Sequence, residues 1–381
     1  MKRFLEKVQR YLRTSDMALL AAVLACSVIS AVMLYSIAAN ELVDLCTMST
    51  FRTQIAASLL GLTAVIVLSI FDYNKFIRMW WLYAPIAIGL TLLTFTPLGY
   101  KREGADDTSW ISIGNFFMQP SEVLKLAFVL SFAYHLARDE EHMNRFWHMV
   151  LLCFHAAVPI GIVALQGDYG TAIVFAFIFM AELLSSRIAM RYILAAAIAI
   201  PTACFVAWTS GLLQSTHKER ILILLHPGTD PNLEYQQDRS LSAMAAGGIF
   251  GKGLSGDGYV FVPEMHNDFI YSYIGQAWGI VGSLLVLVLL VFICLRILVS
   301  SMTSQNMQGK FICVGIFGMI FAHCFMNIGM VLKVMPVIGI PLPFLSAGGT
   351  AVVCMYTAIG LVNSTRCHNI RKARIFYGSD D

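Results

Sequence analysis

Long apolar stretches, separated by short polar ones, run along almost the whole chain. Ten of them approach the roughly 20 residues that a helix needs to cross a bilayer. They lie near residues 17–38, 54–71, 79–96, 120–136, 150–165, 170–185, 188–208, 269–295, 311–335 and 347–364. The pattern predicts an all-α polytopic membrane protein with about ten transmembrane helices.

Composition and charge support this class and orient the chain. Of the 381 residues, 58% are hydrophobic and 13% are charged, about half the charged fraction of a soluble domain. Of the 26 Lys and Arg residues, 17 fall on one side of the spans and seven on the other, while Lys125 and Lys333 lie within spans. The positive-inside bias predicts that both termini lie in the cytoplasm.

The spans divide the chain into a few parts. Residues 1–16 are a basic lead, expected to lie on the anionic inner leaflet. The membrane domain covers 17–364, and its one large extracytoplasmic loop covers about 209–268. Residues 365–381 are a cytoplasmic tail.

The outer segment at 97–119 leads into the fourth span. It is polar at first and becomes apolar from Trp110 without being long enough to span, so we expect it to rest at the membrane interface. Trp110 suits either a membrane-belt residue or a contact to substrate. The fourth span then opens with Pro120, and Glu122 and Lys125 share one face of its first turns. Lys125 either snorkels and pairs with Glu122, or is a buried cation that awaits an anionic ligand.

Two further polar groups stand at outer ends of spans. Asp168 lies in the turn between the fifth and sixth spans and suits a plain turn residue. Glu264, His266 and Asp268 alternate directly before the apolar run that begins at Phe269. Asp268 suits a helix cap, but a carboxylate at this water–lipid boundary commonly serves a function. Glu264 and His266 are candidates to contact the same substrate.

Two stretches rich in glycine or proline predict turns. Residues 240–253 are rich in small residues and indicate a re-entrant or interfacial turn. The stretch Gly251–Gly253 lacks the strand–loop–helix context and the spacing of a phosphate-binding P-loop. Residues 336–349 contain three prolines and three glycines, which predict a stiff outer turn.

The unusual polar side chains share one level, the outer ends of the predicted spans: Glu122, Lys125, Asp168, Glu264, His266, Asp268 and Lys333. A transporter needs polar groups that are reachable from both faces, so the one-sided arrangement favours an enzyme acting on a lipid-linked substrate. A carboxylate near cations suits transfer from a diphosphate-linked donor. The carboxylate removes a proton from the acceptor hydroxyl, while the cations stabilise the departing diphosphate.

Four motifs extend from the first large outer loop to the last span. They are Trp-Ile-x-Ile-Gly…Gln-Pro-Ser-Glu-x-x-Lys at 110–125, Gln-x-Asp-x-Gly-Thr at 166–171, Pro-Glu-x-His-x-Asp-Phe-Ile at 263–270 and Asn-Ile-Gly-Met…Ser-x-Gly-Gly at 327–349. Together they resemble the SEDS family (shape, elongation, division and sporulation), which includes RodA, FtsW and SpoVE. The turn at 336–343 and the short tails are most similar to RodA.

The resemblance implies a SEDS-type fold and a bacterial peptidoglycan glycosyltransferase that polymerises lipid II at the outer face of the cytoplasmic membrane. The implied partner is a class B penicillin-binding protein, with no nucleic acid. The resemblance places the family's essential aspartate on Asp268 and other functional positions on Trp110, Glu122, Lys125 and Asp168. We hypothesise that Asp268 is the general base and that Lys125 holds the diphosphate, with or without a divalent cation such as Mg²⁺, while Asp168 positions Lys125 or the metal.

The chain departs from the family pattern at four positions: Ser109 replaces a usual Arg, Arg239 a usual Gln, Asn267 a usual Thr and Ala347 a usual Tyr. We hypothesise that Arg239 partly replaces the lost diphosphate contact. Two other functions stay open, a lipid II flippase and a non-catalytic scaffold for the crosslinking partner. Elongation and division roles are not separated.

Overall fold

The ten predicted spans each correspond to a helix in a computed structural model of the chain. The structure describes residues 11, 13–101, 107–114, 116–211, 215–226, 228 and 230–377, so most of the basic lead at 1–16 lies outside the described residues. The ten helices are α2 (Met17–Ala39), α3 (Met48–Ile70), α5 (Trp80–Leu92), α6 (Pro120–Arg138), α7 (Phe146–Leu165), α8 (Tyr169–Leu184), α9 (Met190–Thr209), α12 (Ile270–Met302), α13 (Met307–Val331) and α14 (Gly349–Tyr377).

Length and composition mark the chain as a multi-pass membrane protein. Among the described residues, five helices are long and apolar enough to cross a membrane: α2, α3, α7, α12 and α13. Shorter apolar helices start at Trp80, Tyr169 and Met190. The last helix, α14, continues through Tyr377, well past the predicted inner end of the last span at 364.

Local sequence signals explain where several helices begin. The Asp16 carboxylate caps α2 by accepting a hydrogen bond from the Leu19 N–H at 3.1 Å, and Arg296 pairs with the same carboxylate at 2.7 Å. Pro120 occupies the first turn of α6, where its missing N–H costs nothing. Asp168 caps α8. Residues at the helix starts therefore define where these helices begin, which the length of the apolar stretch alone leaves uncertain.

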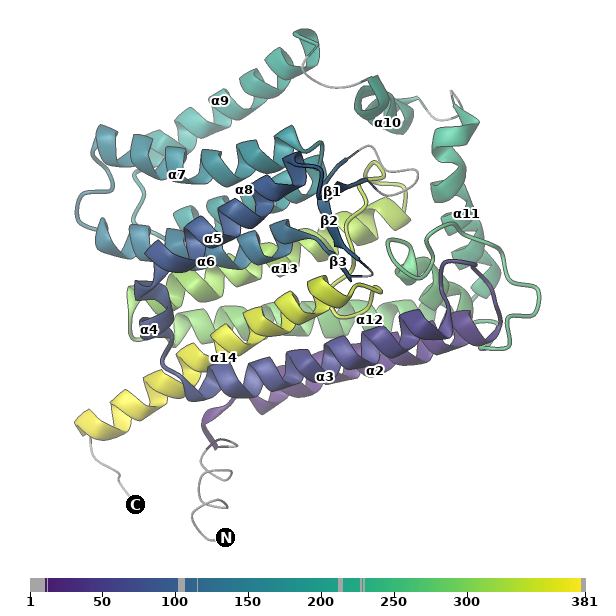
Figure 1. Cartoon of the computed structure of the whole chain (residues 1–381), viewed down its shortest axis with the longest axis horizontal. Coiled ribbons are helices and arrows are strands. Elements are labelled where there is room, and N and C mark those ends of the chain that lie inside the picture. The colour runs from purple at the N-terminus through teal and green to yellow at the C-terminus, as the bar shows by residue number, and fades with distance from the viewer. Residues whose placement is uncertain are drawn as a thin grey trace, which may run out of the picture.

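The helices lie roughly along one another, with α13 in the middle of the bundle (Figure 1). α2 and α3 run together along one edge, beside α14, and α9 stands at the opposite edge. At Gly61, α3 comes so close to α14 that a Cβ would lie 2.7 Å from the Tyr356 side chain. The start of α2 meets the middle of α14, where the Asp16 N–H donates to the Asn363 side chain at 2.8 Å.

A small sheet closes the opposite end of the bundle. Strands β1 (Gly99–Tyr100), β2 (Trp110–Ile113) and β3 (Phe116–Met118) pair antiparallel, with Trp110 opposite Tyr100. The apolar stretch after Trp110, expected simply to rest at the membrane interface, therefore satisfies its backbone groups within a sheet. The short 3-10 helix η1 (Leu93–Phe95) and a helix before it, α4 (Tyr73–Arg78), complete this half of the chain.

Much of the large loop at 209–268 is helical. It contains α10 (Ser215–Leu225) and α11 (Pro231–Gly247), so the prediction of a turn over all of 240–253 was wrong for its first half. Small side chains let α11 pack closely on α12, which favours a helix there. The turn begins only at Gly248, whose φ of 57° suits glycine.

This turn packs on a break in α12. Gly279 has φ 68° and ψ −162°, so it interrupts the helical backbone. The interruption frees backbone N–H groups that the turn satisfies: the Ile280 N–H donates to the Gly248 carbonyl at 2.9 Å. In return, the Lys252 N–H donates to the Gln276 carbonyl at 3.0 Å. A broken helix is tolerated at membrane depth because neighbouring backbone restores its hydrogen bonds.

Candidate functional site

The start of α6 carries a buried ion pair. The Lys125 ammonium lies 2.8 Å from the Glu122 carboxylate, and the two residues are 0% and 2% exposed. The predicted pairing is confirmed, whereas the predicted snorkelling is wrong, because Lys125 does not reach solvent. Its position one turn inside α6 directs the ammonium into the bundle, toward α13. The alternative of a cation awaiting an anionic ligand remains a hypothesis.

The second partner of Lys125 is a residue that the sequence analysis missed. His323, in α13, places Nε2 2.8 Å from the Lys125 Nζ, and its Nδ1 lies 3.1 Å from the Pro341 carbonyl oxygen. His323 is 1% exposed. A single histidine in an apolar span reads as a packing residue. The available signal was its position four residues before Asn327, which puts both on one face of α13.

Asn327 joins two segments of the site. Its side-chain amide donates to the Asp268 carbonyl at 2.8 Å and to the Ile340 carbonyl at 2.7 Å. The segment 336–346, which we call the proline loop, is therefore bound to α13 at two successive turns, by His323 and by Asn327. The turn predicted at 336–349 is confirmed as a non-helical segment up to α14, which begins at Gly349, while its outer location stays a prediction.

The turn that carries Glu264, His266 and Asp268 rests on the end of the proline loop. The Ser346 hydroxyl donates to the Asn267 carbonyl at 2.7 Å, and the Ala347 N–H donates to the His266 carbonyl at 3.0 Å. Glu264 has φ 53°, an unusual conformation for a residue with a side chain. Its carboxylate lies 3.9 Å from the His266 Nε2. These contacts fix the main chain directly before α12.

The Asp268 carboxylate faces the proline loop. A Cβ placed on Gly339, whose φ is 74°, would lie 3.6 Å from the Asp268 Oδ2. Asp268 is half-buried. Glycine at 339 suits both the backbone conformation and the space beside Asp268.

Asp168 lies on the other side of the same loop. Its carboxylate accepts hydrogen bonds from the Thr171 N–H at 2.9 Å and from the Gln119 side chain at 3.0 Å. Burial of the carboxyl raises the pKa of Asp168 to about 6, although the residue as a whole keeps some exposure. The following Gly170 touches Ile338 of the proline loop so closely that a Cβ would lie 2.4 Å from its side chain.

The proline loop thus gathers Asp168, Asp268 and, through His323, the Glu122–Lys125 pair at one end of the bundle. The other candidates lie around this centre rather than in it. Trp110 is half-buried in β2. Arg239 is also half-buried, and its Nε donates to the Phe261 carbonyl at 2.9 Å, so that it braces the loop before the Glu264 turn.

Lys333, which the sequence placed among the candidate cations, has a different role. Its ammonium pairs with Glu234 and Asp238 of α11, each at 2.6 Å. It joins the end of α13 to α11 instead of facing Asp268. Its two carboxylate partners lie about a hundred residues earlier in the chain, beyond the reach of any local pattern.

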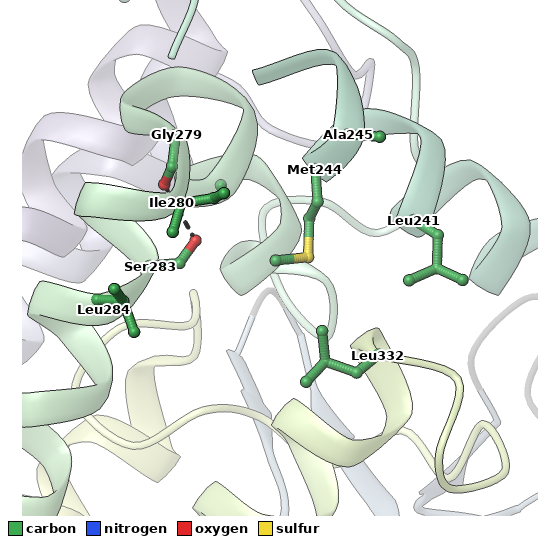
Figure 2. A pocket seen from close by; sticks show the side chains of 9 residues that line it. Leu241, Met244, Ala245, Gly279, Ile280, Ser283, Leu284 and Leu332 are labelled. Atoms are coloured by element: carbon green, nitrogen blue, oxygen red, sulfur yellow. Dashed lines mark hydrogen bonds between the residues drawn. The ribbon is translucent and has the colours of Figure 1, made fainter. Parts of the chain in front are cut away.

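An apolar cavity of about 350 Å³ lies beside the site, between α11 and the break in α12. Figure 2 shows Met244 and Leu241 on α11 facing Ile280 and Leu284 on α12, with Leu332 across the opening. Gly275 and Gly279 also line the cavity. The cavity offers apolar contacts and almost no polar ones, which suits a hydrocarbon chain rather than a sugar.

A protein-built metal site does not fit the described residues. No group of three or more His, Cys, Asp or Glu side chains among them could hold a metal ion together. The Asp268 carboxylate lies beside Gly339, the Asp168 carboxylate is bonded to Thr171 and Gln119, and the Glu122 carboxylate is engaged by Lys125. We therefore assign no step to the divalent cation considered above.

Comparisons with known proteins agree with this architecture. A family model described as "Cell cycle protein", covering FtsW, RodA and SpoVE, matches residues 16–370. A protein of Geobacter metallireducens named "Probable peptidoglycan glycosyltransferase FtsW" is 31% identical over 377 residues, which cover 94% of this chain and 95% of the relative. The chain belongs to the SEDS family.

Other SEDS proteins extend the comparison. The Escherichia coli K12 "Peptidoglycan glycosyltransferase MrdB" is 29% identical, covering 93% of this chain and 94% of the relative. A chain from a structure described as "Structural coordination of polymerization and crosslinking by a peptidoglycan synthase complex" superposes with a TM-score of 0.80 at 24% identity, over 93% of this chain and 98% of that one. Thermus thermophilus RodA gives a TM-score of 0.69 at 22% identity, over 92% and 96% of the two chains.

The SEDS relatives at these identities carry both FtsW and MrdB names, so the RodA-like role remains a prediction. One departure from the SEDS pattern has a clear local environment. Ser109, where an Arg is usual, is 1% exposed and its hydroxyl bonds to the Asp107 carboxylate. A guanidinium does not fit this enclosed position without rearrangement of the segment before β2.

Proposed function

We propose that this chain joins the disaccharides of lipid II into glycan strands at the outer face of a bacterial cytoplasmic membrane, with Asp268 as general base. The chain is a peptidoglycan glycosyltransferase of the SEDS family, because curated relatives that match nearly its whole length carry that name. The substrate, the site residues and the cytoplasmic location of the termini belong to the proposal.

One observation carries the proposal. The Asp268 carboxylate, the turn that carries Asp168 and the buried Glu122–Lys125 pair all approach a single proline loop: Gly339 lies beside Asp268, Ile338 beside Gly170, and Pro341 is joined to Lys125 through His323. Polar groups that cost free energy to place at a membrane boundary are expected where chemistry needs them. Their position at one end suits a reaction on a lipid-anchored substrate whose tail stays in the bilayer.

In the proposed reaction the Asp268 carboxylate accepts the proton of the acceptor sugar's 4-hydroxyl. The hydroxyl oxygen attacks the anomeric carbon of the donor sugar from the side opposite its α-linked lipid diphosphate. The new carbon–oxygen bond forms as the bond to the diphosphate breaks, which gives a β-1,4 linkage with inversion. The half-buried position of Asp268 provides reduced dielectric and an open side for the hydroxyl.

The leaving diphosphate needs cationic stabilisation. Lys125 is the candidate, but its ammonium is fully enclosed between Glu122 and His323. A direct contact therefore requires the proline loop to move away from α6 when substrate binds. Arg239 is a second candidate, since its half-buried side chain lies beside the segment that leads into the Glu264 turn.

The apolar cavity between α11 and α12 is proposed to hold part of the isoprenoid tail. Its wall of Leu241, Met244, Ile280 and Leu284 matches a branched hydrocarbon in chemistry. The lack of a side chain at Gly275 leaves part of this space, because a Cβ there would lie 3.0 Å from the Met244 side chain. A bulky residue there would displace the tail without touching the candidate chemistry.

A class B penicillin-binding protein is the proposed partner. A similar chain occurs in a structure described as a peptidoglycan synthase complex that coordinates polymerisation and crosslinking, which supports such a partner here. The described helices leave apolar faces exposed, including Val288 and Phe292 on α12. We commit to no particular face for the partner.

The test is polymerisation of lipid II by the purified chain with its cognate penicillin-binding protein, in reconstituted membranes, followed by gel analysis of the glycan. The proposal expects long glycan strands. Translocation of labelled lipid II without strand formation would instead indicate a flippase. Strand formation that requires only the partner protein would indicate a scaffold.

A further inference from the structure

His323 occupies a position where its two ring nitrogens have fixed roles. The Pro341 carbonyl oxygen, 3.1 Å from Nδ1, can only accept a hydrogen bond, so Nδ1 carries the hydrogen. The Nε2, 2.8 Å from the Lys125 ammonium, must then accept. The geometry thus defines a neutral imidazole in one tautomer, held between α6 and the proline loop.

The contacts of His323 form one continuous chain through the site. Lys125 donates to both Glu122 and His323, so two of its three ammonium hydrogens are used by residues that the structure describes. One turn along α13, about 5–6 Å away at Cβ, Asn327 binds the proline loop again and holds the Asp268 carbonyl. The ion pair in α6 is therefore connected to the main chain of Asp268 through a single face of α13.

We propose that His323 is a positioning residue for glycosyl transfer: its neutral imidazole couples the Lys125 ammonium to the Pro341 carbonyl and so holds the proline loop against Asp268. This inference rests on the proposed function. His323 is buried and contacts neither the Asp268 carboxylate nor open solvent, so it acts through Lys125 and the loop rather than on the sugar.

Packing alone does not account for a histidine at this position. An apolar ring of similar size would fill the space, but it would leave a buried ammonium hydrogen and a buried carbonyl oxygen without their partner, which is costly. The loop end nearest Pro341 would lose its tie to α6. Because Gly339 and Ile340 directly precede Pro341 in the chain, a displacement of Pro341 would also move the backbone beside the Asp268 carboxylate.

The test compares two substitutions in the chain complexed with its partner. His323→Gln keeps an acceptor for Lys125 and a donor for Pro341, whereas His323→Phe keeps only the ring volume. His155→Phe is the control, because His155 is a half-buried histidine of α7 that contacts Ser131 and His135 in a part of the bundle away from the proline loop. Initial rates of lipid II polymerisation give kcat and KM for each.

We expect His323→Phe to lower kcat by about ten- to a hundredfold with little change in KM, because a displaced catalytic group costs rate rather than substrate affinity. His323→Gln should recover most of that loss, and the control should stay within about twofold of wild type. A His323→Phe variant that is as active as the control would overturn the inference. So would a Gln variant no better than the Phe variant, since that result indicates packing alone.

A second measurement does not depend on a folded Phe variant or on activity. Nitrogen NMR of histidine-labelled wild-type protein, with the His323→Gln spectrum used for assignment, reports which ring nitrogen carries the hydrogen. The inference requires neutral His323 protonated on Nδ1 at pH 7. A hydrogen on Nε2, or on both nitrogens, would refute it. If the wild-type complex makes no glycan, the proposed function fails, while the NMR result still decides the coupling.

Discussion

Removing the charge of Lys125 should destabilise the fold and then be largely corrected by a second substitution. In Lys125→Met the Glu122 carboxylate, 2% exposed, loses the ammonium at 2.8 Å. Breaking a buried ion pair on one side costs about 3–5 kcal/mol. At about 2 °C per kcal/mol for a large chain, the melting temperature should fall by about 6–10 °C.

The double variant Glu122→Gln/Lys125→Met carries no buried charge at this position. We expect it to regain most of the lost stability, since two neutral side chains of similar size replace the pair. The assay is thermal unfolding of wild type, Lys125→Met and the double variant in one detergent at a fixed scan rate, because membrane-protein unfolding is often irreversible. Polymerisation rates are measured in parallel. If Lys125 serves the diphosphate, the double variant stays inactive although it is stable.

Two results would refute this reasoning. If Lys125→Met melts within about 2 °C of wild type, the pair contributes little and its burial has been overrated. If the double variant is as unstable as the single one, the loss does not come from an uncompensated carboxylate. It would then arise from other contacts of Lys125, of which the hydrogen bond to His323 is the main one.

Three smaller predictions test other parts of the account. Gly251 and Gly253 both have positive φ, but only Gly251 is closely packed. A Cβ on Gly251 would lie 2.1 Å from a backbone carbonyl oxygen of α12, whereas a Cβ on Gly253 would have no atom within 4 Å. Gly251→Ala should therefore melt clearly below Gly253→Ala, and equal melting temperatures would contradict the packing described for this turn. Burial raises the folded-state pKa of Asp168 to about 6, so the folded protein binds this proton more tightly than the unfolded chain does. The resulting stabilisation is present at low pH and is lost as the pH rises from about 4 through 6. Wild type should thus gain melting temperature from pH 7 to pH 5 relative to Asp168→Asn, and parallel pH curves would count against it. Arg239→Gln should lower the polymerisation rate several-fold, unlike the exposed Arg187→Gln; equal rates would remove the diphosphate role of Arg239.

The spans could be predicted because crossing a bilayer depends on local apolar length. Each predicted span has its helix, and Glu122 and Lys125 pair as their spacing of three residues indicates. The strands at 99–118 were missed because the stretch is short, and only its pairing with the chain before it defines a sheet. The helical part of 240–253 was missed because small residues and glycines, read alone, suggest a turn.

The long-range contacts could not be read from the sequence. His323 lies 198 residues from Lys125, and nothing in its apolar neighbourhood indicates a polar partner. Lys333 was predicted to lie at the same level as the candidate cations, but its ammonium pairs with two carboxylates of α11. In both cases the partner is chosen by helix packing, which brings together elements far apart in the chain.

Asp268 provides the most direct test of the proposed chemistry. Asp268→Asn keeps the size of the side chain and removes the proton acceptor. Asp257→Asn, an exposed position in the same loop, is its matched control. Both proteins are reconstituted with the cognate penicillin-binding protein and lipid II, and their melting temperatures and complex formation are checked first.

The account predicts that Asp257→Asn makes glycan strands at close to the wild-type rate, while Asp268→Asn makes none although it folds and binds its partner. Glycan strands of normal length and rate from Asp268→Asn would contradict the assignment of Asp268 as general base.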